Sequence, residues 1–201
     1  MENFFKSLTK PARLIFIICG FVCTTLFAIL NGMNFGGTFF SVVASILYVS
    51  VGTTLIVGAP VLTLFNKKEA AQVVYLLLLG YWLLNIVQAL FRAGSASFNN
   101  KDAVDIIIII VSFSIALALV GVLVFGALEF FFKNKAFRFI AVLLFFIAVA
   151  AMLFLFVFHL IDCIQAKAGW TLYFSYIFND IACPVALFFG YLYFFGAPAK
   201  R

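Results

Sequence analysis

The sequence has few charged side chains. Only 10% of its 201 residues are charged, whereas 67% are hydrophobic. A soluble domain has about 25% charged and about 45–50% apolar residues. This composition excludes a soluble globular protein and indicates an integral membrane protein whose surroundings are a lipid bilayer.

The motifs of common enzymes are also absent. The chain has no H-E-x-x-H, no G-x-S-x-G, no C-x-x-C and no Walker sequence. Its single histidine and seven acidic residues leave little material for general acid–base catalysis. We therefore expect neither an enzyme nor a bound cofactor.

The four cysteines follow no ligand or disulfide spacing. We expect them to be small buried hydrophobic residues, with no metal site. The net charge of +6 comes from basic residues in short loops between apolar runs. Membrane orientation explains this pattern better than nucleic-acid binding, which we do not expect.

Six apolar runs are long enough to cross a bilayer. They cover residues 14–30, 39–65, 73–91, 106–128, 139–164 and 170–195. Because lipid cannot satisfy exposed backbone groups, each run is expected to be a helix. The predicted fold is all-α, a bundle of six transmembrane helices in one domain that covers residues 1–201. No small-x-small cleavage site follows Leu30, so we expect the first run to be retained.

Basic residues are distributed unevenly between the two sides of the predicted bundle. Ten of the 13 lysines and arginines lie on one side, and Arg92, Lys101 and Lys167 lie on the other. The positive-inside rule then places both termini in the cytoplasm, as an even number of spans requires. We favour the plasma membrane over an internal membrane.

Three segments end alike. "GTTLIVGAP", "VGVLVFGAL" and "GYLYFFGAP" each precede basic residues, and their glycines Gly58, Gly126 and Gly196 are 68 and 70 residues apart. Three repeated two-helix hairpins would give this spacing. The alternative is chance, because apolar helix ends draw on few residue types.

Polar residues within the spans are costly and are candidates for function. In the predicted outer half they are Asn85, Gln88, His159, Asp162, Asn179 and Asp180. We predict that these six side chains line a polar pocket that opens outward. Glu129 lies four residues before Lys133 near the inner end of its span and is expected to form a surface ion pair with it.

Asp180 lies ten residues after Trp170, which places it about 15 Å into a core about 30 Å thick. Pro184 has no N–H group, so the carbonyl of Asp180 loses its helical partner and the helix is expected to break there. A carboxylate beside a free carbonyl suits a cation, a proton or a polar solute. There are two alternatives. A protonated Asp180 could form a hydrogen bond with Asn85 or Gln88 that only holds the helices together, or Asp180 could contact a partner protein.

His159 and Asp162 are three residues apart and share a helix face. Such a pair could be a proton relay or half of a metal site. We favour a structural pair, in which Asp162 lies near the headgroups and His159 pairs with it.

Two functions are consistent with these features. The first is a small multi-pass protein that binds or transports a small polar solute or ion through the outer pocket. The alternative is a non-catalytic subunit or scaffold of a larger membrane complex, whose partner is another membrane protein or a second copy.

Overall fold

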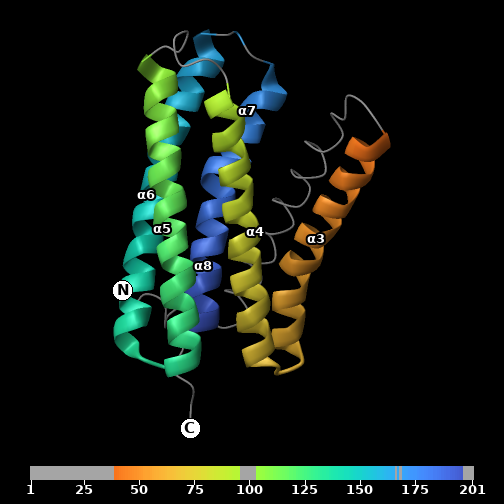
Figure 1. The fold of residues 1–201 in the computed structure, drawn as a ribbon, viewed down its shortest axis with the longest axis vertical. Helices are drawn as coiled ribbons and strands as arrows, with labels where there is room; N and C mark the ends of the chain where they lie inside the picture. The colour runs from red at the N-terminus through yellow and green to blue at the C-terminus, as the bar shows by residue number, and fades with distance from the viewer. Residues whose placement is uncertain (1–38, 96–102, 166, 168, 197–201) are drawn as a thin grey trace.

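A computed structural model describes residues 39–95, 103–165, 167 and 169–196. These residues form a bundle of long helices that run up and down (Figure 1). The first four are α3 (Phe39–Leu64), α4 (Lys68–Ser95), α5 (Ala103–Phe132) and α6 (Lys135–Gln165). The last consists of α7 (Trp170–Tyr176), a π-helical segment η2 (Ile177–Ala182) and α8 (Cys183–Phe195).

Four helical segments are long and apolar enough to cross a membrane. They are Lys68–Phe91, Val104–Phe132, Lys135–Gln165 and Trp170–Phe195. The described part of the chain is helical and contains no strand, so the predicted all-α class is confirmed. These four helices agree with a multi-pass integral membrane protein.

The predicted apolar runs coincide with helices where the structure describes them, but the predicted count of six spans is not supported, because four described helices are long and apolar enough to cross a membrane. Runs 73–91, 106–128 and 139–164 lie within α4, α5 and α6, and run 170–195 coincides with the last helix. Run 39–65 matches α3, of which Ser50–Leu64 is a shorter apolar segment. The predicted first span, 14–30, lies outside the described residues.

Tight turns join the antiparallel helices. At the end of α3, Asn66 has a φ of 59° and the N–H of Lys67 donates to the carbonyl of Leu62, as in a Schellman motif. At the end of α5, Lys133 has a φ of 50°, and the side chain of Asn134 then caps α6 by accepting the N–H of Ala136.

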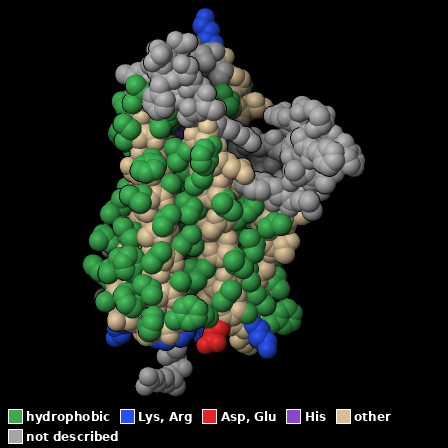
Figure 2. Space-filling view, in the orientation of Figure 1, with side chains coloured by type: hydrophobic (Ala, Val, Ile, Leu, Met, Phe, Trp, Pro, Cys, Tyr) green, Lys and Arg blue, Asp and Glu red, His purple; other side chains and the backbone are tan. Residues whose placement is uncertain are grey.

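Both turns lie at one end of the bundle, which we call the basic end. In the part of the chain that the structure describes, the exposed lysines of this end are Lys67, Lys68, Lys133 and Lys135. Figure 2 shows basic side chains along the lower edge of the molecule and hydrophobic side chains over its long sides. This separation is what a protein embedded in lipid requires.

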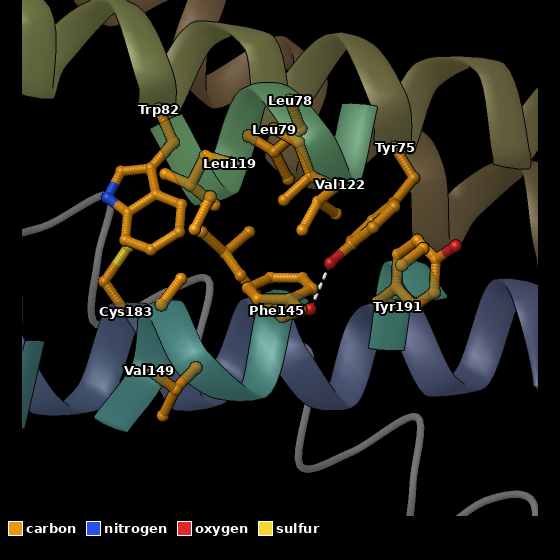
Figure 3. Packing of buried hydrophobic residues seen from close by; sticks show 14 of the residues in the cluster. Tyr75, Leu78, Leu79, Trp82, Leu119, Val122, Phe145, Val149, Cys183 and Tyr191 are labelled. Carbon is orange, nitrogen blue, oxygen red and sulfur yellow. Dashed lines mark hydrogen bonds between the residues drawn. The ribbon is translucent and has the colours of Figure 1, made fainter. Parts of the chain in front are cut away.

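The core lies between α4, α5, α6 and α8 and is rich in aromatic rings. Tyr75, Phe145, Tyr191 and Phe195 are among its largest fully buried side chains. Figure 3 shows side chains from these helices converging on Phe145. The close approach of neighbouring helices depends on small residues at their contacts. A Cβ atom on Gly190 would lie 2.6 Å from Cε2 of Tyr75.

The three glycines of the predicted repeat lie in different surroundings. A Cβ on Gly58 would meet Val74 of α4 at 3.5 Å, and one on Gly126 would meet Leu76 at 3.1 Å and Tyr191 at 3.5 Å. Gly196 instead ends α8. The described residues therefore give no support to three repeated hairpins.

Candidate functional site

The last span changes its helical winding just before Pro184. Ile177–Ala182 form a π-helix, and the N–H of Cys183 donates to the carbonyl of Phe178 five residues earlier. Pro184 then occupies the first turn of α8, where its missing N–H costs least. The predicted break is therefore a widened helical turn, a feature that is frequent at functional sites.

Asp180 lies in this π-helical segment and is completely buried. Its Oδ2 atom lies 2.6 Å from Nδ1 of His159 on α6. Its Oδ1 atom accepts a hydrogen bond of 3.2 Å from the side-chain amide of Asn179. Both carboxylate oxygens are thus satisfied, and the shorter contact is typical of a charge-assisted hydrogen bond.

The imidazole of His159 has a second neighbour, the ring of Tyr176. The two rings stack with their centroids 4.2 Å apart and their planes 20° apart. The His159 side chain is 15% exposed. The edge of the imidazole ring therefore faces the Asp180 carboxylate, and one face of the imidazole ring is covered by the Tyr176 ring. We call His159, Tyr176, Asn179 and Asp180 the Asp180 site.

The structure brings together three of the six predicted polar residues: His159, Asn179 and Asp180. Asn85 instead donates to the carbonyl of Tyr81, one turn earlier in its own helix, and Gln88 is exposed. Among the described residues, the side-chain partners of Asp180 are therefore His159 and Asn179, rather than Asn85 or Gln88.

The expected pair between His159 and Asp162 is wrong. His159 turns its Nδ1 toward Asp180, and Asp162 lies half-buried on the same helix near Tyr176. Two carboxylates could pair with His159. One belongs to Asp162, three residues later on the same helix, and the other to Asp180 on the neighbouring last span. Here the neighbouring helix brings the fully buried carboxylate, which has the greater need of a partner.

The structure adds Tyr176 to the site, although this residue was not among the six predicted from the sequence. The signal was available, because Tyr176 lies four residues before Asp180 and so about one turn away on the same side of the helix.

No cluster of three or more metal-ligating side chains occurs among the described residues. Cys163 and Cys183 are both buried, as expected of small hydrophobic residues.

A second polar cluster lies toward the basic end. Glu129 of α5 is only 3% exposed. Its Oε1 accepts from Nε of Arg138 at 2.5 Å, and its Oε2 accepts from the hydroxyl of Tyr191 at 3.2 Å. The expected surface pair with Lys133 is wrong. Lys133 leaves the helix with a positive φ, and its ammonium group lies 4.7 Å from the centroid of the Phe130 ring.

Two further bonds tie α4 to α8 near the same end. The hydroxyl of Tyr75 donates to the carbonyl of Leu187, and the side-chain amide of Gln72 donates to the carbonyl of Phe194 at 2.8 Å. Phe194 lies in the last turn of α8, where carbonyls have no helical partner. Side chains thus cross-link all four core helices here. We call this set the basic-end network: Gln72, Tyr75, Glu129, Arg138 and Tyr191.

No protein-family model, curated protein or solved structure matches this chain. Functional conclusions therefore rest on the chemistry of its own residues. Of the two polar clusters, the basic-end network pairs a carboxylate with a permanent cation, and the Asp180 site pairs one with a group that can gain or lose a proton.

Proposed function

We propose that this protein binds a small cation or a proton at Asp180, with His159 and Asn179 as its partners. A single observation carries the proposal: a fully buried carboxylate in a π-helical segment lies 2.6 Å from an imidazole nitrogen. An ionisable group inside a membrane span costs free energy and needs compensation. The imidazole is the compensating group that can change its charge.

The chemistry follows from the charge balance of the pair. A protonated His159 neutralises Asp180. Once the imidazole loses its proton, the buried carboxylate retains a negative charge that another cation can neutralise. Carboxylate, amide and carbonyl oxygens are suitable ligands for such a hard cation. A proton and a small monovalent cation would therefore bind alternately.

The site fits a six-span arrangement in the plasma membrane with both termini in the cytoplasm. In that arrangement the run 14–30 supplies a further span and the basic end faces the cytoplasm. The Asp180 site then belongs to the outer half of the bundle. Binding there would be the first step in moving an ion or a small polar solute inward.

A thermal-shift measurement on the detergent-purified full chain tests the proposal. LiCl, NaCl and KCl are compared with choline chloride at equal ionic strength. A cation present at about 100 times its Kd stabilises the folded state by about 2.7 kcal/mol. We expect at least one of the three cations to raise the Tm of the parent, and none to raise that of Asp180→Asn.

Asp162→Asn is the matched control. It removes an acidic group from the end of α6 that carries His159, and Asp162 makes none of the hydrogen bonds to Asp180. It is expected to respond to cations as the parent does. The cation site is refuted if no cation stabilises the parent, or if Asp180→Asn responds equally.

The alternative is a non-catalytic membrane subunit in which the same residues only hold helices together. The observation in its favour is that His159, Asn179 and Asp180 satisfy one another, as polar packing residues do. A parent that responds to no cation, with a stable Asp180→Asn, would favour this second function.

A further inference from the structure

Tyr176 covers one face of the imidazole whose edge meets Asp180. We propose that Tyr176 is the positioning residue of the Asp180 site, and that its ring holds His159 in the protonated form against the Asp180 carboxylate. This inference rests on the proposed function and specifies its resting state, in which the site already carries a proton.

The geometry of the two rings supports this role. Their centroids are 4.2 Å apart and their planes are 20° apart, so the imidazole lies over the face of the phenol ring. A cation within about 6 Å of an aromatic face is attracted by the ring quadrupole. The electrostatic attraction between the same ring face and a neutral imidazole is much weaker. The stack therefore selects the imidazolium form.

The hydrogen bonds of Asp180 agree with an imidazolium partner. Each carboxylate oxygen faces a nitrogen, Nδ2 of Asn179 at 3.2 Å and Nδ1 of His159 at 2.6 Å. An ionised carboxylate accepts at both oxygens, and an imidazolium donates from both ring nitrogens. In a buried setting, an ion pair with no net charge costs less than a lone carboxylate.

Among the described residues, more of the titratable groups near this end of the bundle favour a positive charge on His159 than oppose it: Lys167 is the cation, and Asp105, Asp162 and Asp180 are acidic. On its own helix these are Asp162 and Cys163, and on the last span they are Tyr176 and Asp180. Two more lie at this end of the bundle. Asp105, which is exposed, lies near the start of α5, and Lys167 lies in the exposed turn after α6. Acidic groups thus predominate near the imidazole.

The single histidine makes the test direct, because every imidazole signal of the full chain belongs to His159. The chain is labelled with ¹⁵N-histidine, placed in lipid nanodiscs and measured by NMR at neutral pH. An imidazolium gives nearly equal shifts for its two nitrogens, and a neutral tautomer gives two widely separated shifts. We expect the imidazolium signature in the parent and in Tyr176→Phe, which keeps the ring.

Tyr176→Leu removes the ring and is expected to lower the imidazolium fraction, seen as growth of the two separated shifts of a neutral imidazole. Tyr173→Leu is the matched control. It removes a tyrosine from the same helix, where that ring contacts Trp170 rather than His159. Its spectrum is expected to match that of the parent.

A second series guards against misfolding of Tyr176→Leu. Phenylalanines with increasing ring fluorination, placed at position 176, weaken the negative face of the ring while nearly keeping its shape. We expect the imidazolium fraction to fall stepwise along the series. A constant fraction, or a neutral imidazole in the parent, would overturn the role of Tyr176.

These readouts need no added cation, so the two proposals can fail separately. A constant imidazolium fraction together with cation stabilisation that Asp180→Asn abolishes would refute only the role of Tyr176. A stepwise fall in a protein that no cation stabilises would refute only the cation site.

Discussion

Tyr191 and Glu129 are 62 residues apart in the sequence, and the hydroxyl of Tyr191 donates to Oε2 of Glu129 over 3.2 Å. The other carboxylate oxygen of Glu129 accepts from Arg138. One buried carboxylate thus joins α5, α6 and α8. A buried ion pair of this kind fixes how the helices fit together, because breaking it leaves a charge without compensation.

Arg138→Ala should destabilise the protein by about 3 kcal/mol. This is the low end of the range for breaking a buried pair, because the Arg138 side chain is 30% exposed. Thermal unfolding in detergent measures the loss. Lys135→Ala, an exposed position in the same turn of α6, should change stability by less than about 0.5 kcal/mol.

The double variant Glu129→Gln with Arg138→Ala should recover part of that loss, since no unpaired charge remains. Equal instability of the single and double variants would show that Arg138 acts through packing alone.

Gly190→Ala should destabilise the protein by about 1–3 kcal/mol, the cost of overpacking a core. The added Cβ would lie 2.6 Å from the ring of Tyr75, which is fully buried and cannot move freely. Gly80→Ala is the matched control, because a Cβ there has nothing within 4 Å. It should stabilise α4 by about 0.5–1 kcal/mol through the lower entropy of the unfolded chain. A neutral Gly190→Ala would contradict the close contact between α4 and α8.

Pro184→Ala should abolish the cation response of the protein while preserving its fold. The alanine supplies an N–H group that can bond to the carbonyl of Asp180, so the π-helical segment can convert to α-helix. Conversion rotates Asp180 relative to His159 and breaks their 2.6 Å contact. The thermal-shift measurement with cations tests this. An unchanged response would show that the proline is not needed to form the site.

His159→Leu should destabilise the protein by about 1.5–3 kcal/mol, the range for a hydrogen bond to a charged group. The buried Asp180 would then lack its partner on α6. Adding Asp180→Leu should restore stability, because two apolar residues replace the pair. Thermal unfolding of the two single variants and the double variant gives the coupling between the sites. Additive losses would contradict a direct interaction.

The helices could be predicted from the sequence for a simple reason. A long apolar run in lipid must satisfy its own backbone hydrogen bonds, and only helix or closed barrel does so. The runs 73–91, 106–128 and 139–164 therefore fall within α4, α5 and α6. Pro184 likewise marked the helix irregularity, since a missing N–H group acts locally.

Only the tertiary structure decided which polar residues meet. His159 pairs with Asp180, 21 residues away, rather than with Asp162, and Glu129 pairs with Arg138 and Tyr191 rather than with Lys133. In a soluble helix, a polar face shows which side points outward. Here apolar residues cover both the core and the lipid-facing surface, as Leu79 and Leu84 do within α4. The rotation of each helix, and hence its contacts, is set by packing between helices that lie far apart in the sequence.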